Sequence, residues 1–429
     1  MEKYQLTKHM NRKHMKIYPF IVIFFISIFN FSVRAQDASP SPYSFFGMGD
    51  PAFQGSVENI SMGGINILSD SLHYSINSPA SLSRLKFINF NMGMNNRFIH
   101  AETQTEQEWM SAHNVSYFAL AIPFGKKYAI GFGLLPVNTS GYKIYNTNDL
   151  GTYTFDGEGG NNRIFLAGSY RITPNLSVGV EYQYYFGFLK RENLWVPNDV
   201  ITYTKENNFL DFSGSTLKFS ALYQYQLSKN KYINFNANYR LQADMQAEYK
   251  HISNLFTIIG GTEEIAETLQ DDTQSGSLNI PFSLDFGTGL GKKNKWFIGA
   301  NVNYTSLKDY KNMFYDPDYV HYNDAKSFRI GGMFVPQYNS VTKYWKRITY
   351  RYGGYYKNTG MNLYNEDIKD FGITFGVGLP ALRGISNMNI GVELGQRGKV
   401  TDRLIKENYI NLHIGISLND TWFIKRKIN

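Results

Sequence analysis

The feature that most constrains the fold of this chain is a two-residue alternation of apolar and polar side chains that recurs over most of its length. In residues 407–418 the apolar side chains stand at positions 410, 412, 414, 416 and 418, with mostly polar or small residues between them. This period gives a β-strand with one apolar and one polar face. Since the pattern follows an export signal, we expect the apolar face to meet lipid, as in an outer-membrane β-barrel.

The N-terminus predicts a secretory signal peptide over residues 1–35, cleaved after Ala35. Five basic residues precede an apolar stretch from Ile17 to Val33, which ends in Val-Arg-Ala-Gln. A transmembrane anchor is the alternative, but the stretch is short for one and contains Pro19 and Asn30. The chain has no cysteine, which excludes a lipid-modified N-terminus and disulfides.

Net charge gives no reason to expect a nucleic-acid partner. The formal charge is +8, but residues 1–35 contain six Lys or Arg and one Glu, so the remaining 394 residues carry only +3. No Pro- or Ser-rich linker divides this length into domains, and one large closed sheet uses it. High aromatic content with negative mean hydropathy also suits a barrel, whose strands face lipid at every second residue.

We interpret residues 87–429 as a 14-stranded antiparallel transmembrane β-barrel, an all-β fold. In one strand Phe235, Ala237 and Tyr239 alternate with Asn234, Asn236 and Asn238. A soluble β-sandwich also alternates, but little chain is left to form its second sheet. The strand cores are expected at 87–98, 114–124, 128–142, 161–171, 176–190, 211–227, 233–247, 279–291, 295–307, 325–336, 348–358, 366–379, 386–396 and 407–418.

Connection lengths predict which rim of the barrel faces the periplasm. Most turns after the even-numbered strands are tight, whereas long loops follow the first five odd-numbered strands. Short periplasmic turns and long outer loops are typical of outer-membrane barrels, so both termini are expected in the periplasm. The long segment 248–278 contains Leu255, Phe256 and Ile259, followed by a predicted short helix over 263–270. This apolar cluster is either a binding surface or packs beneath its own loop.

Residues 36–86 lack the two-residue period, and we predict that they form a plug, or hatch, in the barrel lumen. Their Pro and Gly residues require turns, while Phe45, Phe46 and Phe53 require burial. A 14-stranded cylinder is wider than its own inward side chains can fill. The predicted organisation is therefore a signal peptide (1–35), a hatch (36–86) and a barrel (87–429).

The chain resembles the FadL/TodX family of outer-membrane transporters, and in particular the Bacteroidetes branch of that family. The resemblance rests on the fourteen strands, the hatch, the motif Met62-Gly-Gly-Ile-Asn-Ile and the motif Asn77-Ser-Pro-Ala80, which is similar to the Asn-Pro-Ala hatch motif of that family with one inserted Ser. The ends of the mature chain, residues 41–50 and 418–428, are similar to the ends of such proteins. Asn77, Pro79 and Ala80 are the hatch-motif residues.

The resemblance implies passive uptake of hydrophobic small molecules such as long-chain fatty acids or aromatic hydrocarbons. Ligand would be captured by outer loops, pass to a lumen pocket and leave after the hatch moves. The ligand-binding candidates are Phe45, Phe46, Phe53, Leu255, Phe256 and Ile259. The expected partners are outer-membrane lipid and a hydrophobic ligand. An alternative is a protein-binding role in secretion or surface assembly, because relatives in the Bacteroidetes include a secretion-system shuttle with the same barrel.

The sequence indicates no catalytic centre, metal site or cofactor. The His residues of the mature chain are isolated, no loop supplies the oxygens that a Ca²⁺ site needs, and no phosphate-binding glycine loop joins a strand to a helix. Inward ionisable residues of both signs, among them Asp285, Arg329 and Arg351, predict a polar network that braces the lumen. An alternative is that Arg329 or Arg351 meets a ligand carboxylate.

Overall fold

The computed structural model describes residues 39–198, 200–259, 262–308, 310, 317–381 and 385–420. The predicted signal peptide lies outside these residues. The described residues form one compact unit. No helix among the described residues is long and apolar enough to cross a membrane.

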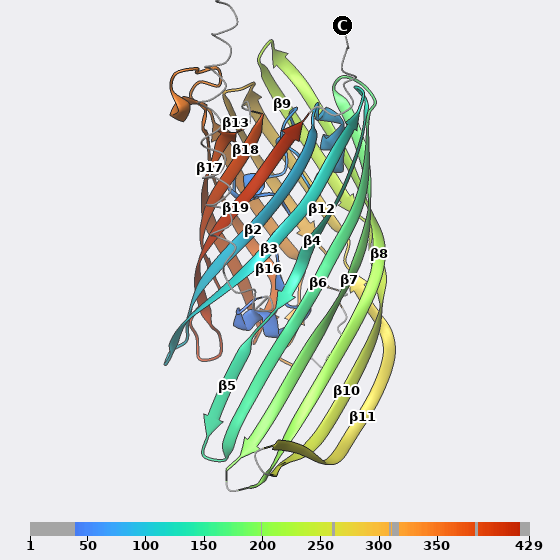
Figure 1. Ribbon diagram of the computed structural model, residues 1–429, viewed down its shortest axis with the longest axis vertical. Helices are drawn as coiled ribbons and strands as arrows, with labels where there is room; N and C mark the ends of the chain where they lie inside the picture. Colours follow the sequence, from blue (N-terminus) through green and yellow to red (C-terminus); the bar gives the residue numbers. More distant parts are fainter. Residues whose placement is uncertain are drawn as a thin grey trace, which may run out of the picture. The chain divides into compact units, whose positions relative to one another are not determined.

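The described chain forms a closed antiparallel β-barrel of fourteen strands, as the sequence predicts. Closure is made by β19 and β2, which pair in register from Lys406 with Glu102 to Asp420 with Ile88. The other strands pair with their neighbours around the ring (Figure 1). The barrel strands are β2 (Ile88–Glu102), β3 (Gln107–Phe124), β4 (Tyr128–Ser140), β6 (Gly151–Arg171), β7 (Leu176–Pro197), β8 (Thr202–Ser228), β9 (Lys231–Arg240), β12 (Ser283–Lys292), β13 (Trp296–Thr305), β15 (Ala325–Phe334), β16 (Thr349–Leu363), β17 (Glu366–Ala381), β18 (Ser386–Arg397) and β19 (Lys406–Asp420).

The alternation of side chains along the strands follows the predicted parity. In β9, Asn234, Asn236 and Asn238 are buried toward the lumen, whereas Phe235 and Tyr239 are exposed on the outside. A band of exposed aromatic and aliphatic side chains surrounds the barrel in this way. An apolar outer face with a polar inner face is the arrangement that a lipid-embedded barrel requires.

Six strands continue beyond the rest of the barrel and form what we call the extended wall: β5 (Lys143–Asn148), β6, β7, β8, β10 (Ala243–Ile259) and β11 (Thr262–Ile280). They reach the lower end of the molecule in Figure 1. β8 alone has 27 residues, whereas about ten suffice to cross a bilayer. Among the described residues, β5 pairs only with β6, and β11 only with β10.

The extended wall corrects the prediction of a long loop over 248–278. This segment forms the β10–β11 hairpin, and the predicted helix 263–270 is part of strand β11. The Glu and Ala residues of 263–270 favour a helix locally, but pairing with β10 decides the structure. The predicted strands 233–247 and 279–291 are each interrupted, at residues 241–242 and 281–282. Pro281 cannot donate a hydrogen bond to a neighbouring strand, which accounts for the interruption at residues 281–282.

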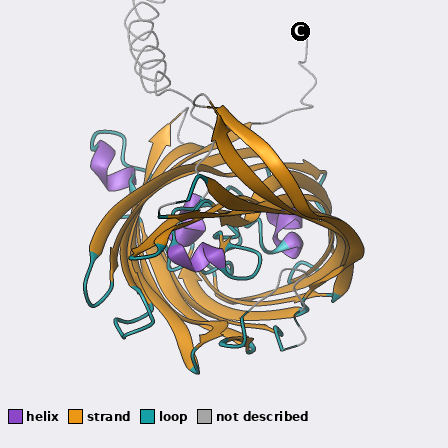
Figure 2. Ribbon diagram, turned by 90° about the horizontal axis from the view of Figure 1, so that it is seen from below, coloured by secondary structure: helices purple, strands orange, loops and turns teal. Residues whose placement is uncertain are grey.

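The segment before the barrel, residues 39–87, is called the N-terminal segment below. It contains η2 (Pro42–Phe45), β1 (Asp50–Pro51), α3 (Val57–Ile60) and η3 (Pro79–Arg84). Figure 2 shows its helices inside the ring of strands. A further 3₁₀ helix, η4 (Tyr344–Arg347), and the short strand β14 (Val320–Tyr322) belong to connections between barrel strands.

Candidate functional site in the barrel lumen

The N-terminal segment is held in the lumen where wall glycines leave room for its backbone. Gly63 and Gly64 adopt positive φ values of 69° and 82°, which accounts for the two glycines of the Met62 motif. A Cβ atom on Gly353 of β16 would lie 2.3 Å from the Gly63 nitrogen, and one on Gly331 of β15 would lie 2.1 Å from the Met62 carbonyl oxygen. The motif therefore fits a glycine-lined patch of the wall.

The Asn77-Ser-Pro-Ala80 motif forms a second contact of the same kind. The Asn77 amide donates to the Gln54 carbonyl, and Pro79 and Ala80 begin η3. A Cβ atom on Gly179 of β7 would lie 2.5 Å from the Ala80 nitrogen, and the Ser169 hydroxyl donates to the Ala80 carbonyl at 3.1 Å. Both motifs on which the family resemblance rests thus lie at contacts between the N-terminal segment and the wall.

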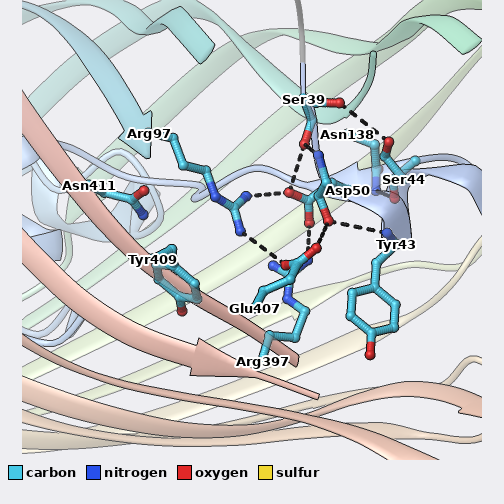
Figure 3. A network of polar contacts seen from close by, with 12 residues as sticks. Ser39, Tyr43, Ser44, Asp50, Arg97, Asn138, Arg397, Glu407, Tyr409 and Asn411 are labelled. Atoms are coloured by element: carbon cyan, nitrogen blue, oxygen red, sulfur yellow. Dashed lines mark hydrogen bonds and ion pairs between the residues drawn. The ribbon is translucent and has the colours of Figure 1, made fainter. Parts of the chain in front are cut away.

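A buried charge network connects the start of the N-terminal segment to three barrel strands (Figure 3). Arg397 Nη1 of β18 donates to Asp50 Oδ1 at 2.6 Å, and Arg97 of β2 donates to Asp50 Oδ2. The carboxylate of Glu407 on β19 accepts from the Ser41 hydroxyl and lies within 4.0 Å of both guanidinium groups. We call Asp50, Arg97, Arg397 and Glu407 the Asp50 network. Burial opposes ionisation of Asp50, but the two guanidinium groups hold the pKa of its carboxyl well below the ordinary value.

The predicted lumen residues form further contacts of this type. Asp285 accepts hydrogen bonds from Asn66 of the N-terminal segment and from two strand asparagines. Arg351 Nη2 lies 3.8 Å from Glu58 Oε1, and Arg329 Nη1 donates to the Gly64 carbonyl at 3.4 Å. All three predicted residues therefore lie against the N-terminal segment.

A cavity of about 520 Å³ remains between the N-terminal segment and the wall. Phe46 and Phe53 line it, together with Asn77, Asp285 and Arg329 among the predicted residues. Phe45 packs beside it, edge-on to Phe46 and Tyr142. Eight cationic and four carboxylate side chains line the cavity.

The predicted apolar residues of segment 248–278 lie elsewhere. Leu255, Phe256 and Ile259 belong to β10 of the extended wall, where the Phe256 ring stacks on Tyr203. None of them lines the cavity. The structure therefore does not bring the two predicted groups of ligand-binding residues together.

One part of the cavity lies at a gap in the barrel wall between β3 and β4. These strands pair only from Phe118 with Leu134 to Phe124 with Tyr128. Among the described residues, the part of β3 before Phe118 pairs with β2 alone. The edge of β4 that faces the gap pairs with the short strand β1. Figure 1 shows the two strands diverging. Residues 114–117 of β3 and 136–139 of β4 both line the cavity, which therefore reaches the gap.

Sequence reasoning missed the Asp50 network, although part of the signal was present. Arg97, Arg397 and Glu407 share the inward parity of the asparagines and glycines on their strands. Their convergence on Asp50 depends on which strands close the barrel and on how the N-terminal segment folds. Neither can be derived from alternation alone.

Together these features define an outer-membrane type of β-barrel whose lumen contains an N-terminal segment and a mixed polar and apolar cavity. Residues 16–429 match the family model described as BamG, and the chain belongs to the BamG family. A search of curated proteins gives no match.

Solved structures share the fold. The toluene transporter TodX of Pseudomonas putida is 15% identical with a TM-score of 0.54, over 87% of this chain and 99% of TodX. A FadL homologue of Pseudomonas aeruginosa is 12% identical (TM-score 0.53, covering 86% and 98%). The Ralstonia pickettii toluene transporter TbuX is 14% identical (TM-score 0.53, covering 86% and 99%). The predicted resemblance to the FadL/TodX family is thus confirmed for the fold, and the Bacteroidetes branch stays a prediction.

Proposed function

We propose that this protein is a passive outer-membrane channel for hydrophobic small molecules such as long-chain fatty acids or aromatic hydrocarbons. The observation that carries the proposal is the lumen cavity that reaches the β3–β4 gap. A molecule in this cavity lies beside a sideways route toward the bilayer, where β1 of the N-terminal segment lines the β4 edge of the gap. Structures with the same fold include toluene transporters, and Phe46, Phe53 and Tyr185 give the cavity an apolar part.

The proposed path has three stages. Ligand enters from the rim that carries the extended wall, occupies the cavity beside Phe46 and Phe53, and leaves through the gap or after a shift of the N-terminal segment. Both termini of the mature chain lie in the periplasm in this scheme. It requires no cofactor, because passive movement down a gradient needs only a binding site and a path.

The test is uptake of radiolabelled oleate and toluene by cells that lack the gene, with and without the wild-type protein restored. We expect restored cells to take up at least one of the two faster at low external concentration, where diffusion across the outer membrane limits entry. Equal uptake with and without the protein, for both substrates, would contradict the proposal.

A second candidate function is a protein-binding role in secretion or surface assembly, and the extended wall favours it. Residues 262–277 of β11 are exposed on both faces of the strand, and Leu278, which follows them, is buried. The outer edge of β11 pairs with no other strand among the described residues. An unpaired edge is a surface to which another chain can add a strand.

This second function is tested by removing the outer half of the hairpin. Lys250 pairs with Thr273, so residues 251–272 can be replaced by an Asn-Gly turn without changing the register below. Affinity capture from solubilised membranes should recover a stoichiometric protein with the wild type and lose it with the shortened hairpin. Recovery of the barrel alone from wild-type membranes counts against this role.

A further inference from the structure

The rim of the barrel opposite the extended wall carries a ring of basic side chains. Because neighbouring strands are antiparallel, the connections β3–β4, β6–β7, β8–β9, β12–β13 and β15–β16 all lie at this rim. Residues 126–127, 229–231, 292–295 and 343–347, in these connections and at the strand ends beside them, contain two, two, three and three Lys or Arg residues. We call these ten cations the basic rim.

No acidic side chain balances the basic rim. The five connections and the strand ends beside them contain neither Asp nor Glu, over residues 124–128, 171–176, 228–232, 291–296 and 334–350. In the described part of the chain, no carboxylate oxygen lies within 4.0 Å of a nitrogen of the ten cations. The extended wall differs, since residues 262–277 of β11 contain five carboxylates and no Lys or Arg. The positive charge of the basic rim is therefore uncompensated within the described protein.

Aromatic side chains lie beside the basic rim on the outer face of the barrel. Tyr128, the first residue of β4, is 59% exposed and stacks on Tyr170 of β6. Trp296, the first residue of β13, stands opposite Phe334, the last residue of β15. Tyr and Trp are enriched at the level of the lipid headgroups in membrane proteins. Cations in the adjoining turns follow directly after this level, where the phosphate groups of a lipid leaflet lie.

The β15–β16 connection places the 3₁₀ helix η4 outside the ring of strands (Figure 2). Trp345 and Tyr344 of this helix are 54% and 47% exposed. Lys346 Nζ lies 5.7 Å from the centroid of the Trp345 ring, and Arg347 Cζ lies 5.3 Å from that of Tyr344. The Tyr344 hydroxyl donates to the Pro380 carbonyl of β17 at 3.1 Å. Exposed aromatic rings that carry cations are typical of an anchor at a membrane interface.

We propose that the basic rim binds the phosphate groups of anionic phospholipids in the leaflet around it, and that η4 anchors the rim in this leaflet. Lys and Arg donate charge-assisted hydrogen bonds to phosphate oxygens, and basic residues beside a membrane attract anionic lipid. The cations belong to connections from β3–β4 to β15–β16, so they are spread around the barrel as a leaflet is, rather than gathered in one patch for a protein. None of them lines the cavity, so the inference is independent of the proposed channel.

Quenching of Trp345 fluorescence by brominated lipid measures this binding. The full-length protein is reconstituted in phosphatidylcholine vesicles that contain brominated phosphatidylglycerol or brominated phosphatidylcholine at the same mole fraction. The Trp345 signal is the difference between the wild type and Trp345→Phe. We expect both lipids to quench Trp345, with an apparent affinity for phosphatidylglycerol that is about fivefold or more above that for phosphatidylcholine, the effect of even one basic residue near an anionic surface.

Removal of charge tests whether the preference is electrostatic. The triple variant Lys343→Gln/Lys346→Gln/Arg347→Gln should lose the preference for phosphatidylglycerol, while both lipids still quench Trp345. Salt gives a second measurement that needs no variant. About 0.5 M NaCl should weaken the preference of the wild-type protein, because exposed charges are screened within a few ångströms at that ionic strength.

A matched control removes the same charge from other parts of the protein. Lys143, Lys250 and Lys399 have side chains that are 56%, 43% and 51% exposed, and Lys143→Gln/Lys250→Gln/Lys399→Gln should keep the preference. Equal quenching by the two lipids in the wild type would overturn the proposal. Trp345 that neither lipid quenches would also overturn it, because η4 then does not reach the bilayer. A preference that neither the triple variant nor salt reduces has the same meaning.

Discussion

Removal of the Arg397 guanidinium is expected to release the N-terminal segment from the barrel while the barrel stays closed. In Arg397→Gln, the buried carboxylates of Asp50, Asp370 and Glu407 lose a shared ion-pair partner. Arg97 still pairs with Asp50 and Glu407, and Lys357 remains near Asp50 and Asp370. Asp50 and Arg397 are 2% and 7% exposed, so water does not screen the change. Breaking a buried ion pair by removing one partner costs about 3–5 kcal/mol.

This cost falls on the docked state of the N-terminal segment, because Asp50 belongs to that segment and strand pairing does not involve the side chain. Hydrogen exchange is the assay. The amide of Ala52 donates to the Val137 carbonyl of the wall, so its exchange reports departure of the segment directly. The amide of Gly63 donates to the Thr374 hydroxyl of the wall and also to the Ile60 carbonyl within the segment, so contact with the wall adds to its protection. A loss of 3–5 kcal/mol accelerates their exchange by about a hundredfold to a few thousandfold. Amides of β18 and β19 should keep their wild-type rates.

A double-mutant cycle tests the electrostatic reasoning itself. Asp50→Asn alone should destabilise docking, since it removes the negative charge that pairs with both guanidinium groups and one of the two oxygens that accept from them. In the Arg397→Gln background the same substitution should be neutral or stabilising, because it removes one of the carboxylates that have lost Arg397. An equal cost of Asp50→Asn in both backgrounds would refute the idea that the network holds the segment through charge.

Two further predictions concern the N-terminal segment. Gly353→Ala should weaken docking of the N-terminal segment by about 1–3 kcal/mol, because the added Cβ atom would lie 2.3 Å from the Gly63 nitrogen. Limited proteolysis of the segment measures this loss. Gly168→Ala is the control, because a Cβ atom at Gly168 meets nothing within 4 Å. Burial lowers the pKa of the His73 imidazole, but the Asp70 carboxylate at 2.6 Å raises it more, to about 9. The pair therefore stabilises the folded N-terminal segment fully below pH 6.5, and the contribution is lost as the pH rises through 9. His73→Gln should flatten that part of the pH profile, and an unchanged profile in the variant would refute the assignment.

The sequence predicts the number of strands and the side to which each side chain points, because lipid on one side and a polar lumen on the other impose a strict two-residue period. The alternation of Asn234, Asn236 and Asn238 with apolar neighbours is enough to predict which side each residue faces. Strand ends were not accessible in this way. Beyond the apolar band both faces of β11 are polar, so the period disappears while strand pairing with β10 continues.

The site was predicted only in part, for a related reason. Parity places Asp285, Arg329 and Arg351 in the lumen, but it does not say which part of the N-terminal segment each one meets. Asp50 lies in a segment without a period, and its contacts with Arg97 and Arg397 join residues 47 and 347 positions apart in the sequence. Convergence over such separations is set by barrel closure, which no local pattern encodes.

Of the two exits proposed above, passage of small molecules from the lumen cavity through the β3–β4 gap is the one that the cavity lining supports. Its most direct test is uptake of labelled oleate and toluene by cells that carry Val115→Trp or Val180→Trp. Both valines are similarly exposed on the outside of the barrel, at 44% and 43%, but only Val115 lines the cavity at the gap. With equal amounts of protein in the membrane, Val115→Trp should reduce uptake toward the level of cells without the gene, and Val180→Trp should leave it at the wild-type rate. Wild-type uptake with Val115→Trp would contradict passage through the gap.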